Sequence, residues 1–491
     1  MESVLFWLIS IGEHRYNTAV SQGYCKGGLG LLALVFVVAW TGVTSLQVET
    51  NFLEISGLPI ENAISVESIS QDLAEPMVPS GPLASTTQLA LTNLVNTVFT
   101  NRLDAGALET VVAGGDIRVA WLLADLLRFY QRGPERDLLV TAFSRLTRSE
   151  PPVSRHPDFV WTFNLLIGWD LPAWEGYSAL KRRIYVAVDA RWDPFFEDDQ
   201  GVDWRMITWG GVFADSRPYG DNGPCDCIPA LDNITTTSAS GGDWYGDEQI
   251  VFGVVVNGEA LALPRHQMEV HEMVNLTLGG RHLGIPYCTL CGSAQAYFTD
   301  GVGGGERVVL RTSGLLSRSN KVMYDLVTSS VFNTFTGEAV TGPLGAAAMV
   351  LEQVSVVTTT WGNWKVAHPD TQILAEDGGV GRTYLADPLR GRDDQGPIFP
   401  VGNIDPQLPV QEKVVGVVSE DGRPVAFPVA AIRETLVGKE EVRFGGLVVR
   451  LAGGVRVFDL DGVELPTHEA FWFAWSQFHP STLVWTPPEF R

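Results

Sequence analysis

The chain has 491 residues, which is enough for two or three domains. Hydrophobic residues make up 45% and charged residues 19%, so the chain can bury a large core and is not disordered as a whole. The formal net charge of −23 would repel phosphate backbones, and we expect no nucleic-acid partner. Five cysteines are too few for a disulfide scaffold, although four of them form two closely spaced pairs.

The N-terminus carries an uncharged apolar run at residues 27–46, which follows a segment at 1–26. Arg15 and Lys26 precede the run, and acidic residues follow it. Positive charge keeps the preceding side in the cytoplasm. The run is therefore predicted to be a signal anchor or a cleaved signal peptide, with a buried core helix as a third interpretation. We expect a protein that is membrane-anchored facing outside the cytoplasm, with this helix as its membrane contact, or secreted.

Three segments follow in chain order. Residues 47–85 are rich in Pro, Ser and Glu, as is typical of a linker. Residues 86–150 show a helical period and predict a small bundle, in which Asp116 caps one helix, Gly133 ends that helix and Pro134 starts the next. Residues 151–211 form a Trp-rich connecting region, and packing between domains is favoured over a carbohydrate platform.

Residues 212–491 read as a β-rich domain with an internal repeat. VFGVVVNGEALALP in the first copy, about 249–300, corresponds to VVGVVSEDGRPVAFP in the second, about 412–460. The NG and DG pairs predict hairpins, because these residues accept positive φ. Each copy is predicted to be a hairpin, a helix and another hairpin, so the fold class is α+β with an N-terminal helical bundle. Only the first copy carries cysteines, so chemistry is expected there.

Cys288 and Cys291 form a C-x-x-C motif after an apolar strand. Such a pair can be a redox centre, part of a metal site or a static disulfide, because thiolates are both nucleophiles and soft metal ligands. Cys225 and Cys227 lie in a polar loop. They could complete a four-thiolate zinc site with the first pair, or the four residues could form disulfides that clamp the loop.

His271 and Glu272 are the polar residues expected to join the C-x-x-C pair. HEMVN differs from the zinc-protease motif because Asn275 stands where the second His is needed, so a zinc protease is excluded. One His with two Cys could still bind zinc or copper, with Glu272 in support; otherwise no cofactor is expected. Further polar candidates follow the Cys motif, namely Arg311, Ser313, Tyr324 and Asp325.

Several motifs in the same order resemble a family of bacterial and archaeal proteins called domain of unknown function 3179. They are VNGEALALP, HEMVN, PYCTLCGSAQAYF, SGLLSRSNKVMYD, TGEAVTGPLG, TTTWGNWKVAHPDTQIL and FWFAWSQFHPST, over about residues 209–485. The resemblance implies an exported or membrane-linked protein, and it implies no activity. The family's signature falls on His271, Glu272, Cys288, Cys291, Ser313, Gly314, Tyr324 and Asp325.

This chain departs from the family's pattern at two places. Thr289 stands within the C-x-x-C motif where the family has Pro, and a loop between Asp215 and Ile228 interrupts a stretch that is continuous in the family. A site that used Cys225 and Cys227 would be peculiar to this protein, so the resemblance favours a local disulfide between them.

Two functional hypotheses follow. The first is an extracytoplasmic protein with a metal-binding or thiol-redox site at Cys288, Cys291, His271 and Glu272. The second is a non-enzymatic binding or assembly module with structural disulfides, whose protein partner or small ligand is not identified. Neither decides whether the chain is an enzyme. A hydrolase ranks last, because no G-x-S-x-G elbow or paired-carboxylate pattern supports it.

Overall fold

The computed structural model describes residues 75–487 except 101, 155, 200, 302–306 and 392–395. The predicted cytoplasmic segment, the apolar run at 27–46 and most of the predicted linker lie outside the described residues. Within the described part of the chain, no helix is both long and apolar enough to cross a bilayer.

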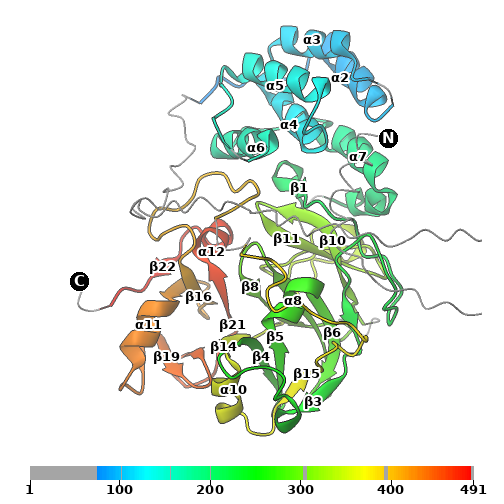
Figure 1. Cartoon of the computed structure of the whole chain (residues 1–491). Coiled ribbons are helices and arrows are strands. Elements are labelled where there is room, and N and C mark those ends of the chain that lie inside the picture. Colours follow the sequence, from blue (N-terminus) through cyan, green and yellow to red (C-terminus); the bar gives the residue numbers. More distant parts are fainter. Residues whose placement is uncertain are drawn as a thin grey trace, which may run out of the picture. The chain divides into compact units, whose positions relative to one another are not determined.

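A helical region comes first in the described chain (Figure 1). Its helices are α2 (Ser85–Thr97), α3 (Ala105–Gly114), α4 (Ala120–Phe129), α5 (Pro134–Thr147), α6 (Asp158–Gly168) and α7 (Tyr177–Val188). Asp116 accepts a hydrogen bond from the Arg118 N–H and caps a short 3-10 turn that leads into α4. Gly133 takes a φ of 85° before Pro134, which begins α5. Helices therefore continue well into the Trp-rich region.

Buried polar contacts join the helices to the β region. Lys181 on α7 pairs with Asp125 on α4 at 2.8 Å, and its Nζ also donates to the carbonyl of Ile207. Arg128 on α4 donates from Nε to the carbonyl of Trp209, and Asn164 on α6 accepts from the N–H of Val401. Most of the tryptophans of the connecting region are buried among these elements, as packing predicts: Trp161, Trp174, Trp192, Trp204 and Trp209. The segments around Trp209 and Val401 are thus held by the helices.

The β region contains five small sheets in the described residues. The first has the order β1 (Ile207–Trp209), β10 (Leu310–Ser317), β11 (Asn320–Asp325), β12 (Val331–Asn333). The second has the order β13 (Gln353–Val354), β9 (Ala296–Phe298), β7 (Arg281–Cys288), β6 (Met273–Leu278), β2 (Leu231–Asp232), with β8 (Ser293–Ala294) also paired to β7. The third has the order β14 (Val357–Thr360), β4 (Ile250–Val256), β5 (Glu259–Pro264), β15 (Gln372–Leu374), β3 (Thr236–Ser238).

The remaining two sheets belong to the C-terminal part. One has the order β21 (Thr467–Phe471), β16 (Lys413–Val418), β17 (Pro424–Pro428), β22 (Leu483–Val484), and the other has β18 (Val442–Phe444), β19 (Leu447–Leu451), β20 (Val455–Phe458). The helices of the β region are α8 (Arg265–His271), α9 (Gly342–Ala346), α10 (Trp361–Ala367), α11 (Val429–Leu436) and α12 (Trp472–Phe478). The predicted combination of a helical N-terminal region and a mainly β region is confirmed.

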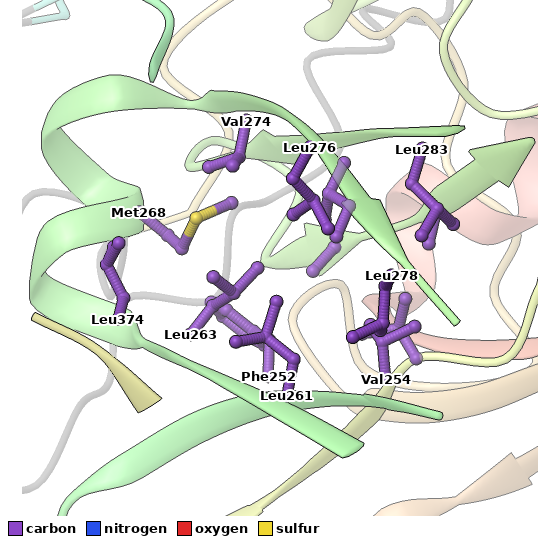
Figure 2. Close-up of a cluster of buried hydrophobic side chains, with 14 of the residues drawn as sticks. Phe252, Val254, Leu261, Leu263, Met268, Val274, Leu276, Leu278, Leu283 and Leu374 are labelled. Atoms are coloured by element: carbon purple, nitrogen blue, oxygen red, sulfur yellow. The ribbon is translucent and has the colours of Figure 1, made fainter. Parts of the chain in front are cut away.

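An apolar core lies between the hairpins of the first predicted copy. Figure 2 shows Phe252, Leu261 and Leu263 of the β4–β5 hairpin facing Val274 and Leu276 of β6, with Met268 of α8 beside them. The turn between β4 and β5 is the predicted Asn257-Gly258 pair, with φ values of 50° and 87°. The core places the end of α8 close to the start of β6 and so fixes the position of His271 and Glu272.

In two hairpins from different parts of the chain, the ring of a tryptophan packs directly against a glycine of the first strand. Gly253 of β4 packs against Trp364 of α10, and Gly416 of β16 packs against Trp475 of α12. The indole Nε1 of Trp364 donates to Thr371 at 2.9 Å, and that of Trp475 donates to Thr482 at the same distance. A side chain larger than hydrogen has no room at either glycine.

This contact gives a first prediction. Gly416→Ala should lower the free energy of unfolding by about 3 kcal/mol, the upper end for overpacking, because the new Cβ would lie 2.1 Å from a ring carbon of Trp475. Gly246→Ala is the control, since its Cβ would meet nothing nearer than Gln249 at 3.8 Å. Urea unfolding of the two variants checks the prediction, and equal losses would contradict it.

Candidate functional site

The C-x-x-C motif forms the turn between β7 and β8. The N–H of Cys291 donates to the carbonyl of Cys288 at 3.2 Å, and Gly292 completes the turn with a φ of 60°. A Cβ at Gly292 would lie 2.9 Å from the ring of Phe471, so the turn packs tightly against β21. This geometry places the two Sγ atoms 2.9 Å apart, and both cysteines are free thiols.

The two thiols are buried but have different surroundings. Cys288 lines a cavity of about 90 Å³, and its Sγ accepts a hydrogen bond from the N–H of Lys321 at 3.4 Å. The Sγ of Cys291 lies 3.4 Å from the carbonyl oxygen of Ser319 and 3.3 Å from Oδ1 of Asn320. A donor favours a thiolate and acceptors favour a thiol. The geometry therefore favours a thiolate at Cys288 and a proton on Cys291.

The electrostatics follow this asymmetry. Burial raises the pKa of Cys288, but hydrogen bonds from the Cys291 thiol and the Lys321 N–H more than offset it, and its pKa falls below the ordinary thiol value. Burial, together with the hydrogen bond to Cys288 and the charge there, raises the pKa of Cys291 well above that value. Of the two sulfurs, Cys288 is therefore the one whose surroundings favour the thiolate.

Glu272 lies beside the thiol turn, as expected. It follows α8 with a φ of 52°, a left-handed conformation that is unusual for a residue other than glycine. Its carboxylate pairs with Lys321 Nζ at 3.0 Å and accepts from the Thr289 hydroxyl at 3.0 Å. Its carbonyl also accepts from Lys321 Nζ at 2.5 Å. Glu272, Lys321 and Cys288 line the same cavity.

His271 does not join this group by any hydrogen bond. Its Nδ1 lies 2.8 Å from the carbonyl oxygen of Pro229, and its Nε2 lies 2.7 Å from the hydroxyl of Tyr384. A carbonyl can only accept, so Nδ1 carries the proton and the lone pair of Nε2 accepts from Tyr384. Burial lowers the pKa of His271 to about 4. The ring is therefore neutral, and both of its nitrogens are engaged by Pro229 and Tyr384 rather than turned to a metal ion beside the two sulfurs.

The expected metal centre at His271, Glu272, Cys288 and Cys291 is not assembled. Three or more ligand atoms from Cys, His, Asp or Glu come within 4.8 Å of one another at one place in the described residues, and the residues there are Asp215, Cys225 and Cys227. This triad could hold a metal ion by distance alone. The structure, however, also places Cys225 and Cys227 at disulfide distance, which is compatible with the expected local disulfide. Arg217 also occupies both carboxylate oxygens of Asp215, each at 2.7 Å.

The other polar candidates hold the framework together. Arg311 makes a buried bidentate pair with Asp232, at 2.9 and 2.6 Å, and the Tyr324 hydroxyl donates to the carbonyl of Asp215. Asp325 accepts from the N–H groups of Val309 and Thr328. The Ser313 hydroxyl donates to the carbonyl of Val322 within the β10–β11 pair, although Ser313 also lines the cavity. In the described structure these four side chains make hydrogen bonds to strands and loops and none to a thiol.

Four residues around the site come from distant segments. Lys321 reaches Glu272 across 49 positions of sequence, and Tyr384 reaches His271 across 113. Phe399 closes one wall of the cavity and Gly210 another. Sequence reasoning did not connect them, because no local spacing relates these positions to the C-x-x-C motif.

Comparison with known proteins gives one match. Residues 225–459 match the family described as "Protein of unknown function (DUF3179)". No curated protein and no solved structure matches the chain. The matched segment contains the thiol turn, Glu272 and Lys321, and it is shorter than the stretch over which the motifs indicated the resemblance. The resemblance read from the sequence is nevertheless confirmed, and residues 225–459 of this chain match that family of unknown function.

Proposed function

We propose that this chain is an exported or membrane-anchored thiol–disulfide redox protein, with Cys288 and Cys291 as its two-electron centre. The proposal rests on two thiols that are in contact with each other at the wall of a cavity and that have different hydrogen-bond partners. A Cys288 thiolate is held by the N–H of Lys321, and Cys291 is held as a thiol by acceptor oxygens. Reactive cysteine pairs owe their reactivity to such an unequal division of one proton.

The surroundings of the two sulfurs favour redox chemistry over a metal site. Two thiolates bound tetrahedrally to one zinc at about 2.3 Å would lie about 3.8 Å apart. The two Sγ atoms here are 2.9 Å apart, and no third Cys, His, Asp or Glu ligand atom lies within 4.8 Å of both in the described residues. Closing to a disulfide and opening to hold a metal need nearly the same movement of the sulfurs, about 0.9 Å, so the lack of a third ligand atom is what favours redox chemistry.

The proposed reaction is an exchange with a disulfide of another molecule. The Cys288 thiolate attacks one sulfur of that disulfide and forms a mixed disulfide, and the other sulfur leaves as a thiolate. Cys291 then loses its proton and attacks Sγ of Cys288, which closes the Cys288–Cys291 disulfide and releases the second thiolate. The pair loses two electrons and its one proton, and the partner disulfide gains the two electrons and leaves as two sulfurs that share that proton.

A redox titration of the full chain tests this function. Glutathione buffers set the potential, and alkylation with mass spectrometry reports the state of each cysteine. We expect Cys288 and Cys291 to oxidise together as a two-electron couple, and Cys288→Ser to slow reaction with glutathione disulfide by about 100-fold or more. The variant Cys225→Ser/Cys227→Ser is the control and should keep the couple. Thiols that stay reduced at every potential in a folded chain, or a stoichiometric metal that both thiols need, would contradict the proposal.

The β region supports a further part of the proposal, an internal duplication. Residues 249–300 and 412–460 each contain a hairpin, a helix and a hairpin: β4, β5, α8, β6, β7 and β16, β17, α11, β18, β19. Each first hairpin also pairs with a later antiparallel strand and a later parallel strand, and each has a tryptophan on its glycine. The segment that follows the second copy covers the thiols, since Phe471 and Trp472 share an apolar cluster with Cys288 and Cys291.

A binding module is the second candidate, and one observation favours it. A cavity of about 580 Å³ lies between the two copies, with Gly253 and Val255 on one side and Arg456 and Phe458 on the other. A ligand or peptide could occupy such a groove without any thiol chemistry. Under this alternative, the Cys288→Ser variant would keep the ligand affinity of the wild type.

A further inference from the structure

The cavity that Cys288 lines limits the size of a molecule that can react there. The exposed fractions of Cys288 and Cys291 are 2% and 0%, so a reactant that leaves the chain in place has to fit this cavity. Its volume is about 90 Å³, which is the share of roughly three water molecules in the liquid. A peptide that carries a disulfide needs the wall to move, whereas a reactant of a few non-hydrogen atoms does not.

Among the polar side chains that line the cavity, Lys321 is the one with a hydrogen to spare. In the described structure the hydroxyls of Thr289, Thr312 and Ser313 each donate to an oxygen of the protein. The Lys321 ammonium has three N–H groups, and its partners in the described residues are the carboxylate and the carbonyl of Glu272. One N–H of Lys321 is therefore left to donate to a bound molecule.

Most of the remaining wall of the cavity is apolar. It is formed by side chains from several segments: Val212, Ile228, Leu290, Leu315, Leu316 and Phe399. A reactant that fills the cavity is stabilised if it has an apolar body, because apolar surface is then removed from water. Its reactive end needs an electrophilic atom for Cys288 and, next to that atom, a hydrogen-bond acceptor for Lys321.

We propose that this cavity binds a small alkyl hydroperoxide, and that the hydroperoxide oxidises Cys288 and Cys291. The proposal rests on the proposed redox function and names the oxidant that the cavity selects. An alkyl hydroperoxide has an apolar body and an O–O bond, whose outer oxygen is electrophilic and whose inner oxygen is the leaving group. The alkyl group lies on the apolar wall. The free N–H of Lys321 donates to the inner oxygen, where negative charge develops as the O–O bond breaks.

The reaction moves two electrons from the cysteine pair to the O–O bond. The Cys288 thiolate attacks the outer oxygen and becomes a sulfenic acid, and the alkoxide leaves and takes a proton from water to give an alcohol and hydroxide. The Cys291 thiol then attacks Sγ of Cys288, which closes the disulfide. Its proton leaves with the sulfenic hydroxyl as water. Because the two Sγ atoms are 2.9 Å apart, the resolving thiol already lies beside the sulfur that it attacks.

The rates of disulfide formation with three peroxides test the size and shape of the reactant. The full chain with Cys25→Ser is reduced, freed of reductant and mixed with one peroxide, and alkylation with mass spectrometry reports the Cys288–Cys291 disulfide. We expect tert-butyl hydroperoxide to react about tenfold faster than hydrogen peroxide, which leaves the apolar wall uncovered. It should also react about tenfold faster than cumene hydroperoxide, whose phenyl ring does not fit without distorting the wall.

Val212→Phe tests whether the hydroperoxide reacts from within the cavity. Val212 is a half-buried residue of the wall, so a phenyl ring there narrows the cavity and the buried core keeps its residues. The variant should react with tert-butyl hydroperoxide about tenfold more slowly, because the reactant no longer reaches the attacking sulfur in line. Val366→Phe is the matched control, since Val366 is 84% exposed on α10, and it should react like the wild type. In Cys291→Ser, dimedone should trap the sulfenic acid at Cys288.

Two results would overturn the hydroperoxide site. One is a wild-type chain with which either of the other two peroxides reacts as fast as tert-butyl hydroperoxide. The other is an equal rate for Val212→Phe and the wild type. The redox titration of the wild-type chain in glutathione buffers keeps this failure distinct. If the couple titrates while either result is found, the assigned oxidant is wrong and the redox function stands; if the couple does not titrate, the two thiols form no disulfide in the fold and both proposals fail.

Discussion

Replacing Lys321 with methionine is expected to raise the pKa of Cys288 and to lower the free energy of unfolding by roughly 3–5 kcal/mol. The Lys321 ammonium is almost buried, pairs with Glu272 at 3.0 Å and also donates to its carbonyl. Without it, the Glu272 carboxylate stays buried without a cation. The lysine charge lowers the pKa of Cys288 and the glutamate charge raises it, so only the unfavourable charge would remain.

Two further variants serve as controls for this experiment. Lys365→Met removes an exposed pair with Asp247 and should cost less than about 1 kcal/mol. Glu272→Gln should move the pKa of Cys288 downwards, opposite to Lys321→Met, because it removes the charge that opposes the thiolate. The measurement is the rate of alkylation at Cys288 against pH, read by mass spectrometry, together with urea unfolding. Shifts in the same direction for Lys321→Met and Glu272→Gln would refute this assignment.

The hairpins of the β region could be predicted because their signals are local. Asn257-Gly258 and Asp421-Gly422 mark turns through residues that accept positive φ, and Gly258 and Gly422 do so at 87° and 79°. The motif at Cys288 could likewise be placed at a turn after a strand. Helix capping by Asp116 and the break at Gly133 are local signals as well, and both are found where the sequence predicts them.

The association of His271 with the thiols could not be predicted correctly, because it depends on a single backbone conformation. Adjacent residues of a helix point about 100° apart, so the sequence alone does not say which neighbours each one meets. Here Glu272 leaves the helix with a φ of 52°, so its side chain meets Lys321 while His271 meets Pro229 and Tyr384. No sequence spacing predicts the contact of Lys321 with Glu272 or that of Tyr384 with His271, because tertiary packing alone brings these residues together.

Acid lability is the second large effect, and His271 is one of its expected sources, because burial also lowers the pKa of His468 to about 3 and of His479 to about 4. Burial lowers the pKa of His271 to about 4 in the folded chain, whereas an unfolded histidine has its ordinary value of about 6.5. Between these values the unfolded chain binds more protons, so stability rises with pH. Stability should therefore fall as the pH drops below about 6.5, and His271 alone should account for about 3 kcal/mol by about pH 4.

His271→Gln should remove this part of the pH dependence. Glutamine can donate to Pro229 and accept from Tyr384 without titrating, so the variant keeps the polar contacts of a neutral ring. Urea unfolding of both proteins at about pH 7 and about pH 4.5 should show the wild type losing about 2–3 kcal/mol more than the variant. Other titrating groups are common to both proteins and cancel in this difference.

Tyr384→Phe separates the titration of His271 from a general loss of packing. The Tyr384 hydroxyl donates to Nε2, which only the neutral ring can accept, so its removal should raise the pKa of His271. The acid lability of this variant should then lie between those of the wild type and His271→Gln. Because the three proteins differ in the proton affinity of one ring, an identical pH dependence in all three would show that His271 is not the group that titrates on acid unfolding.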